Sequence, residues 1–394
     1  MNILTISTLY PNPVDLKHGI FVRTRSMHLV KHHPDIKPVI IAPVPWFFFS
    51  STLLGSFASF KQIPAVRDDN GLEVHHPRYL VIPKLGMFLA PFTLAWTLKR
   101  SLKKLVADKR KLGVEFSLID GHYFFPDGVA IANAAKVLKL PFVCTARGTD
   151  INLIPENPLA KTMVLKVLQE SRRNFAVCQA LKDEMVALGA DESKVSVLRN
   201  GVDLELFEWS NNEKQLTLKK QIGIEGRLVV SVGGLVERKG HHLTIEAIAN
   251  MPDVHFVLVG DGPERDALVA LAKKLNVSDR VTLTGALTQP EVNKWFMAAD
   301  CSVLASSREG WANVLLESMA SGCPVVATDV WGTPEVVQSE SVGRLCKRNV
   351  ASIASEMENL LAQTTLRSSV RSYAESFDWK ETSDKQREYF ATIT

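Results

Sequence analysis

Residues 309–327, EGWANVLLESMASGCPVVA, carry the most informative pattern of this chain. An apolar strand at 302–305 and a polar loop precede helix-forming residues at 312–320. A glycine and a proline then end the helix, because glycine favours a helix C-terminus and proline cannot continue one. A second apolar strand follows. The pattern predicts that Glu309 precedes the helix and that Glu317 lies on it.

Eight positions separate the two carboxylates, which corresponds to roughly 12 Å at about 1.5 Å of rise per residue. That distance is about the length of a nucleotide sugar. The unpaired N–H groups of the first helical turn and the positive end of the helix dipole suit a diphosphate placed between the acids. Glu317 can then accept from ribose hydroxyls while Glu309 faces the sugar. The alternative interpretation is a solvated helix with two ordinary acids.

The stretch resembles the Glu-x7-Glu signature of the retaining glycosyltransferases of family 4, and the likeness continues through 322–328 and 332–337. Further upstream, 231–240 and 258–265 fall where that family has its phosphate-side loop and a second glycine turn. The resemblance implies a GT-B fold, in which two Rossmann-like, doubly wound parallel-sheet domains flank an interdomain cleft. It also implies that the C-terminal domain binds the donor and that transfer retains the anomeric configuration. The donor-binding residues expected on this basis are Gly19, Gly234, Gly310, Trp311, Ala312, Asn313, Val314 and Glu317.

Length and apolar periodicity point independently to two α/β domains. A chain of 394 residues exceeds what one hydrophobic core usually organises. Short apolar runs alternate with helical patterns in both halves, which indicates parallel sheets covered by helices on both faces. The predicted strands are 3–6, 39–42, 118–119, 142–144, 175–177 and 195–198, then 228–232, 254–259, 281–283, 301–304 and 325–327.

The turn-forming pair Asn200-Gly201 marks the joint between the domains. We expect an N-terminal acceptor-binding domain at 1–205, with the final helix at 377–394 returning to it by resemblance to the family. The C-terminal domain at 206–376 would bind the nucleotide sugar.

Composition excludes several classes of protein. With 46% hydrophobic and 22% charged residues, the chain is of ordinary globular type. Its five cysteines are scattered and lack a Cys-x-x-Cys pair, which indicates buried thiols in a reducing compartment. The first residues predict a buried strand in place of a signal peptide. Prolines interrupt the apolar segment 39–60, so it is not predicted to span a membrane. These features predict a cytoplasmic protein.

Charge is unevenly distributed along the chain. Residues 1–205 contain 26 Lys+Arg and 18 Asp+Glu, a net +8, and the remainder contains 20 and 24, a net −4. A basic first half suits an anionic partner such as a lipid diphosphate, a charged glycan or an anionic membrane face. The basic run that begins at Lys99 follows the apolar run 87–96, and 46–49 is Trp-Phe-Phe-Phe. Peripheral docking on the inner membrane face, a solvated amphipathic helix and buried aromatic packing all stay open.

Nucleic acid is not an expected partner. Nothing interleaves the basic residues with a set of aromatic side chains that could stack on bases.

Loops that follow strands of the first half supply further candidates, because ligands of open α/β sheets lie at the carboxyl ends of the strands. Gly19 opens a helix after the first strand, where a glycine lets the backbone approach a phosphate. His122 ends a strand, and the resemblance implies that it contacts the sugar. Relatives commonly have His-Gly where this chain has Arg147-Gly148. Arg147 is therefore expected either to hold an anionic acceptor or to pair with Asp150.

Cationic side chains are expected to stabilise the departing diphosphate. Lys239 aligns with the family's phosphate-binding lysine, whereas the family's earlier arginine falls at Gly234. Arg238 is the expected substitute for that arginine. The alternative is that Arg238 is a surface charge opposite Glu237.

No metal and no cofactor are expected. The sequence has no Asp-x-Asp pair and no histidines at zinc spacing. The motif at 260–265 lacks the third glycine of a dinucleotide-binding loop, which argues against a dehydrogenase.

The sequence thus predicts a metal-independent hexosyltransferase that uses a nucleotide sugar and a glycan or lipid-linked acceptor. Segments 8–13 and 147–150 resemble bacterial enzymes of surface-polysaccharide synthesis, including teichuronic-acid-type polymers. The alternatives are a nucleotide-sugar epimerase or sugar phosphorylase of the same fold, and a non-catalytic carbohydrate-binding protein. The expected catalytic residues are Glu309, Lys239, Arg238 and His122, with Arg147 and Asp150 on the acceptor side.

Overall fold

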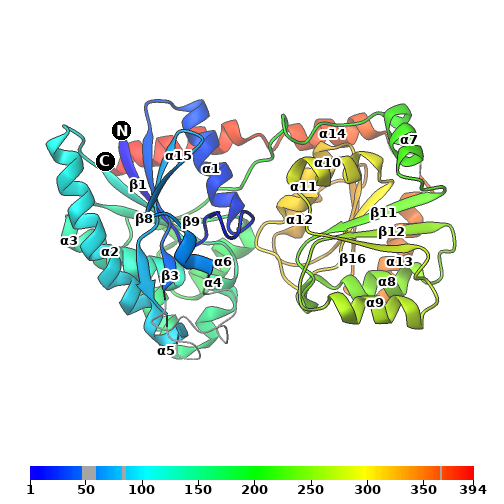
Figure 1. The fold of residues 1–394 in the computed structure, drawn as a ribbon, viewed down its shortest axis with the longest axis horizontal. Helices are drawn as coiled ribbons and strands as arrows, with labels where there is room; N and C mark the ends of the chain where they lie inside the picture. Colours follow the sequence, from blue (N-terminus) through cyan, green and yellow to red (C-terminus); the bar gives the residue numbers. More distant parts are fainter. Residues whose placement is uncertain (47–58, 82–85, 364–365) are drawn as a thin grey trace. The chain divides into compact units, whose positions relative to one another are not determined.

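The computed structural model describes residues 1–46, 59–81, 86–363 and 366–394. The chain forms two compact units (Figure 1). Unit 1 contains Met1–Asn200 and Trp379–Thr394, and unit 2 contains Gly201–Asp378. Within the described residues, no helix combines the length and the apolar character that crossing a membrane requires.

Unit 1 is built on an eight-stranded sheet of order β10-β9-β8-β7-β1-β2-β5-β4. Its strand pairs are parallel except β4 with β5, which form an antiparallel edge. The inner strands are buried on both faces, which explains their continuous apolar sequences. The strands are β1 (Asn2–Ile6), β2 (Lys37–Ile41), β4 (Val66–Asp69), β5 (Leu72–His75), β7 (Leu118–His122), β8 (Phe142–Thr145), β9 (Arg173–Ala176) and β10 (Val195–Val197), with β3 (Val44–Trp46) and β6 (Arg78–Leu80) as a separate parallel pair.

Helices cover both faces of this sheet. Helix α15 packs beside α1, and its Phe390 enters the core formed by Ile3, Leu118 and Phe175 (Figure 1). On the other face α3 contacts β7 and β8, and α2 packs against α3. The helices are α1 (Ile20–His32), α2 (Gly86–Lys111), α3 (Val129–Leu138), α4 (Thr149–Asn152), α5 (Pro158–Glu170), α6 (Gln179–Ala187) and α15 (Trp379–Ile393).

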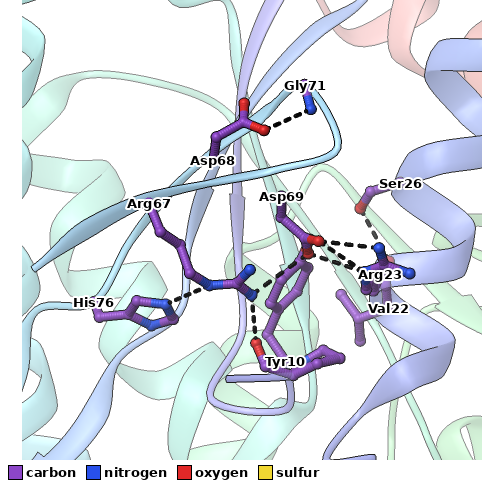
Figure 2. A network of polar contacts seen from close by, with 10 residues as sticks. Tyr10, Val22, Arg23, Ser26, Arg67, Asp68, Asp69, Gly71 and His76 are labelled. Atoms are coloured by element: carbon purple, nitrogen blue, oxygen red, sulfur yellow. Dashed lines mark hydrogen bonds and ion pairs between the residues drawn. The ribbon is translucent and has the colours of Figure 1, made fainter. Parts of the chain in front are cut away.

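A buried carboxylate ties the β4–β5 edge to the loop after β1 and to α1. Asp69 accepts from the Tyr10 hydroxyl (3.0 Å) and from Nε (2.9 Å) and Nη2 (3.0 Å) of Arg23. Arg67 also reaches Asp69 (3.4 Å), and it donates to the Pro11 carbonyl and to His76 (Figure 2). Burial tends to raise the pKa of Asp69, but the hydrogen bond from Arg23 and the charges of both arginines hold it below its usual value.

Unit 2 is built on a six-stranded sheet of order β13-β12-β11-β14-β15-β16 whose strand pairs are all parallel. The strand order reverses between β11 and β14, which are neighbours although two strands separate them along the chain. Such a reversal leaves room at the carboxyl ends of the two strands for a ligand. The strands are β11 (Arg227–Val232), β12 (Val254–Val259), β13 (Val281–Gly285), β14 (Cys301–Leu304), β15 (Val325–Thr328) and β16 (Gly343–Cys346).

The helices of unit 2 also lie on both faces of its sheet (Figure 1). Helices α8, α9 and α13 pack on one face, and α10 and α11 lie on the other with α14 against α11. The helices are α7 (Asn212–Gln221), α8 (His241–Ile248), α9 (Arg265–Lys274), α10 (Gln289–Ala298), α11 (Asn313–Ala320), α12 (Thr333–Val336), α13 (Val350–Leu361) and α14 (Arg367–Glu375).

One buried arginine fastens α14 to the rest of unit 2. Arg367 is 5% exposed and donates to the carbonyl oxygens of five residues, at 2.7–3.2 Å. Burial lowers the pKa of its guanidinium. These carbonyls belong to Ser210, Phe296, Met297, Ala299 and Ser321.

The eleven predicted strands are confirmed, and within the described residues five short strands were missed. The missed strands are β3 and β6, which pair only with each other, β4 and β5 at one sheet edge, and β16 at another. Edge strands tolerate charged residues, so a sequence such as Val-Arg-Asp-Asp in β4 carries no apolar signal.

The units divide at 200/201 and 378/379, whereas the sequence placed the boundaries at 205/206 and 376/377. Hydrogen bonding explains where the first linker belongs. The Val202 N–H donates to the Phe377 carbonyl (2.9 Å), and Arg371 donates to the carbonyls of Leu204 and Phe207. Residues 201–207 are thereby attached to unit 2.

Arg367→Met should lower the stability of unit 2 by on the order of 3 kcal/mol, because buried carbonyls lose their donor and the new side chain cannot replace it. The matched control is Arg387→Met, which removes an exposed arginine that pairs with Asp35 at the surface. Calorimetry should show a lower melting temperature for Arg367→Met than for wild type. The melting temperature of Arg387→Met should stay close to that of wild type. Equal shifts would contradict the structural role of Arg367.

Asp69→Asn should destabilise unit 1 by about 2 kcal/mol at neutral pH, because two arginines lose their anionic partner. The folded-state pKa of Asp69 is depressed, so its contribution is present above the ordinary value of 3.8 and is lost as the pH falls through the folded value. The deficit of the variant should therefore shrink in acid. Asp68→Asn is the control, since Asp68 accepts from the Gly71 N–H in an exposed turn (Figure 2). Urea titrations at pH 7 and pH 3.5 measure both.

Candidate functional site

Two loops of unit 2 meet where the strand order reverses. The loop after β11 contains Arg238 and Lys239, and the loop after β14 contains Ser306 and Glu309. Because β11 and β14 are hydrogen-bonded neighbours, their carboxyl ends place these loops side by side. The Ser307 N–H donates to the Arg238 carbonyl (2.8 Å), which fixes one backbone against the other.

The Glu309 carboxylate is the centre of this cluster. Its Oε1 accepts from Lys239 Nζ (2.6 Å), from the Ser306 hydroxyl (2.6 Å) and from Arg238 Nη1 (3.4 Å). The side chains of Lys239 and Glu309 are 14% and 10% exposed, so the ion pair is largely desolvated. Burial tends to raise the pKa of Glu309, but the charges of Lys239 and Arg238 outweigh it and hold the pKa below its usual value. Glu309 is therefore ionised at neutral pH.

Ser306 was not singled out from the sequence. Its hydroxyl donates to Glu309, and its own carbonyl accepts from the Thr328 hydroxyl (2.6 Å). A serine three residues before a glutamate is common in loops, so the sequence carried no signal for this contact.

Arg238 is not opposed by Glu237, and the alternative interpretation of the sequence is wrong on this point. Glu237 pairs with Arg348 (3.1 Å). The Arg238 guanidinium donates instead to the Arg308 carbonyl (2.7 Å) and leans toward Glu309, with 41% of its side chain exposed. It is the more accessible cation of the cluster.

Helix α11 begins at Asn313, one residue later than predicted. Glu309 therefore lies in the loop, and a helical rise does not describe the whole interval from Glu309 to Glu317. The Asn313 N–H is already committed to the Trp311 carbonyl (3.0 Å). The N–H groups of Ala312 and Val314 have no acceptor among the residues that the structure describes, and they remain available at the start of the helix.

Trp311 packs into unit 2. The residue is 7% exposed, and the centre of its ring lies 6.1 Å from the ring centre of Phe377. Gly310, next to it, is partly exposed in the same loop. This placement gives Trp311 a packing role that the sequence did not predict.

Glu317 lies on α11, partly buried. In the described part of the chain, no group donates a hydrogen bond to its carboxylate. Burial raises its pKa to about 7, and no neighbouring charge opposes this effect. A carboxyl without a partner is open to hydroxyl donors from a ligand.

Glycines allow two loops of unit 2 to pack closely. A Cβ at Gly260 or Gly262 would fall 1.8 Å from the Gly233 oxygen or 2.5 Å from the Leu235 oxygen. The sequence placed 258–265 at the family's second glycine turn, and the structure shows that this turn supports the loop after β11. Gly234 lies at the tip of that first loop, where its carbonyl contacts a buried histidine.

That histidine, His241, was missed from the sequence. Its two ring nitrogens contact the Ser231 hydroxyl and the Gly234 carbonyl, both at 3.2 Å. Burial lowers its pKa to about 4, so the ring is neutral and bridges β11 to the loop beyond it. Its place at the start of α8, immediately after Gly240, was the available signal.

The predicted residues of unit 1 gather at the carboxyl edge of its sheet. Gly19 precedes α1 with φ 64°, and a Cβ there would lie 2.3 Å from the Leu9 backbone. Both facts require glycine at this position, independently of any phosphate.

His122 ends β7 and is 1% exposed. Arg147 Nη2 donates to its Nδ1 (2.6 Å), and its Nε2 lies 3.5 Å from Asp120 Oδ2. Burial, together with the charge of Arg147, lowers the pKa of His122 to about 4 against the opposing effect of Asp120. The ring is neutral and faces protein groups, so the predicted sugar contact would require the Arg147 guanidinium to move.

Arg147 and Asp150 do not form a side-chain ion pair, which corrects one of the two expectations for Arg147. The Asp150 carboxylate accepts backbone N–H groups from Phe124 (2.8 Å), Arg147 (3.0 Å) and Gly148 (2.8 Å). Burial raises its pKa against these hydrogen bonds. Asp150 therefore shapes the loop, while the Arg147 guanidinium contacts His122 and the Asn200 side chain (3.3 Å).

In the part of the chain that the structure describes, no three His, Cys, Asp or Glu side chains are grouped as metal ligands. The five cysteines are buried, and none of them forms a disulfide.

Comparisons with known proteins agree with this architecture. The family model described as glycosyl transferases group 1 matches residues 214–377, and the model described as glycosyltransferase family 4 matches residues 56–206. The chain is 29% identical over 337 residues to a Bacillus subtilis protein named as a teichuronic acid biosynthesis glycosyltransferase, TuaC, covering 84% of this chain and 82% of that protein.

Solved structures show the fold. Sucrose-phosphate synthase of Thermosynechococcus elongatus superposes with a TM-score of 0.82 at 18% identity, covering 100% of this chain and 99% of that one. HepE of Anabaena, in complex with UDP-glucose, superposes with a TM-score of 0.73 at 20% identity and covers 100% of both chains. The chain thus matches glycosyltransferase family 4 over residues 56–206 and the group 1 glycosyl transferases over residues 214–377, and it has the GT-B fold.

Proposed function

We propose that this glycosyltransferase moves a hexose from a nucleotide sugar to a glycan or lipid-linked acceptor of a bacterial surface polysaccharide, with retention of configuration and without a metal ion. The observation that carries the proposal is the desolvated Lys239–Glu309 pair at the carboxyl ends of β11 and β14. Two findings support the finer assignments. HepE, a protein of similar fold, binds UDP-glucose, and the relative TuaC is named for teichuronic acid synthesis.

Charge accumulates on the diphosphate as the bond to the sugar breaks, and cations placed in advance stabilise it. Lys239 and Arg238 supply that charge in our assignment. The N–H groups of Ala312 and Val314 add donors at the positive end of α11. These groups perform the neutralisation for which other enzymes use a divalent cation.

Glu309 has two tasks in this proposal. Before the donor binds, it holds the Lys239 ammonium in place at 2.6 Å. Once a diphosphate faces Lys239, the ionised Glu309 can accept hydrogen bonds from hydroxyls of the donor sugar. Its depressed pKa keeps it in the acceptor-only form that this contact needs.

Glu317 is assigned to the ribose. Its carboxyl, which has no hydrogen-bond partner among the described residues, lies about one turn along α11 from the amides assigned to the diphosphate. Ribose hydroxyls would donate to its carboxylate and thereby favour the ionised form.

In the transfer step, the acceptor oxygen forms a bond to the anomeric carbon while the bond from that carbon to the diphosphate oxygen breaks. The departing phosphate oxygen takes the acceptor proton, so no separate base is required. We assign the acceptor to unit 1, where Arg147 and the basic composition suit an anionic group, and the donor to unit 2.

Lys239→Ala should lower kcat by roughly 10²–10³-fold, because the leaving diphosphate loses a preorganised cation. Glu309→Gln should lower kcat by at least about tenfold, since Lys239 then loses its anionic partner and the sugar loses an acceptor. Glu237→Gln is the matched control in the same loop, because Glu237 faces Arg348. Initial rates of nucleoside diphosphate release test all three, with the nucleotide sugar that gives the largest thermal shift in a donor panel. Near-normal rates for both site variants would show that the site is wrongly assigned.

The same assay separates the alternative functions. An epimerase would release an altered free sugar in the absence of acceptor, and a non-catalytic binding protein would release no nucleoside diphosphate at all. Transfer to an added acceptor, with the product linkage determined by NMR, distinguishes retention from inversion.

Donor affinity should depend on pH through Glu317. Its pKa is about 7 in the free protein, and hydrogen bonds from ribose would lower it. Binding should then release about half a proton at pH 7, and affinity should fall roughly tenfold from pH 8 to pH 6. Calorimetry with UDP-glucose in buffers of different ionisation enthalpy measures both, because its diphosphate has no group that titrates in this range. Glu317→Gln should bind more weakly and without proton release. An unchanged affinity for this variant would remove Glu317 from the donor site.

A further inference from the structure

Helix α2 of unit 1 exposes a row of large aromatic side chains. Phe88, Phe92 and Trp96 are 46%, 58% and 63% exposed. Each is four positions from the next, which adds about 40° around a helix, so the three lie within about 80° of arc. The opposite side of α2 is already used by the core, since Leu94, Leu98 and Leu102 are fully buried. The aromatic row is therefore not an unfilled part of the core of unit 1.

Basic residues continue the same face toward the end of the helix. Lys99 follows Trp96 by three positions, and Lys103 follows Lys99 by four. Arg100 places its guanidinium 5.8 Å from the Trp96 ring centre. Helix α2 contains seven basic residues and one acidic residue.

These cations differ from the later basic residues of α2 in their partners. Lys109, Arg110 and Lys111 pair with Glu73, Glu115 and Asp108. The described residues place no carboxylate within ion-pair distance of Lys99, Arg100, Lys103 or Lys104. The face thus joins exposed aromatic rings to positive charge that unit 1 does not neutralise.

We propose that this face of α2 docks on an anionic lipid bilayer. The face, called the outer face of α2, consists of Phe88, Phe92, Trp96, Lys99, Arg100 and Lys103. Aromatic rings favour the boundary between headgroups and acyl chains, and lysine and arginine favour anionic headgroups. Because its other side is packed against unit 1, α2 would lie flat on the bilayer surface.

Charge favours lipid over a second copy of the chain as the occupant. Two outer faces in contact would bring together two sets of unpaired cations without a carboxylate between them, whereas phosphate headgroups supply the missing anions. The sequence had pointed to Trp46–Phe49 as the aromatic element. Trp46 is partly buried in β3, and 47–49 lie outside the described residues.

Co-sedimentation of the full chain with vesicles tests the proposal, and it needs neither donor nor acceptor. Wild type should partition at least about tenfold more strongly onto phosphatidylcholine vesicles with 30% phosphatidylglycerol than onto phosphatidylcholine alone. Lys99→Gln with Lys103→Gln should reduce partitioning by roughly 25-fold, at about fivefold per charge. The control, Arg110→Gln with Lys111→Gln, removes paired cations of the same helix and should change it less than about threefold.

The aromatic row has its own matched pair of variants. Phe92→Ser with Trp96→Ser should reduce partitioning at least about tenfold, whereas Leu159→Ser, at an exposed leucine of α5, should not. Brominated lipids should quench the fluorescence of wild type, and Trp96→Phe should still bind with less quenching. Unchanged melting temperatures show that each variant is folded.

Three results would overturn the proposal. The first is equal partitioning of the wild type onto neutral and anionic vesicles. The second is wild-type partitioning by both Lys99→Gln with Lys103→Gln and Phe92→Ser with Trp96→Ser. The third is a wild-type protein that forms a dimer, does not bind vesicles, and becomes a monomer when Phe92→Ser and Trp96→Ser are introduced.

Discussion

The ion pair between Lys239 and Glu309 organises the loops at the carboxyl ends of β11 and β14 in unit 2. Removing an ammonium and a carboxylate from water costs several kcal/mol per ion, and their attraction restores this only when the geometry is close. Here the separation is 2.6 Å, and Ser306 adds a second donor to the same oxygen. A buried pair of this kind contributes little to stability compared with a well-packed apolar pair. In our proposal, the pair holds a cation ready for an anionic leaving group.

The parallel sheet explains why these residues meet although about seventy positions separate them along the chain. The strand order places β14 beside β11, so the loops that follow both strands leave the sheet at the same edge. Glycines then allow close contact around the first loop. His241 fastens its tip through the Gly234 carbonyl, and Gly260 and Gly262 leave space for its backbone. The loop that presents the cations is therefore supported from two sides.

The two units use buried charge differently. In unit 2 a carboxylate is kept ionised by cations. A second carboxyl, Glu317, has no hydrogen-bond partner among the described residues and a pKa of about 7. In unit 1 the buried carboxylates hold loops. Asp150 accepts three backbone N–H groups, and Asp69 joins α1 to the β4–β5 edge. This contrast supports our assignment of donor chemistry to unit 2 and gives the carboxylates of unit 1 a structural task.

The sequence by itself determined the fold class, the eleven apolar strands and the stretch that contains Glu309 and Glu317, because buried parallel strands and helix ends have strong local signatures. Only the tertiary structure decided which side chains meet. No local pattern distinguishes Arg238 beside Glu237 from Arg238 beside Glu309, and none places Ser306 on the carboxylate or Arg147 on His122. The sequence also did not predict the edge strands β4 and β16, since a strand paired on one side tolerates polar residues. Periodicity reports burial along one element, whereas contacts and pKa values depend on which elements the sheet order brings together.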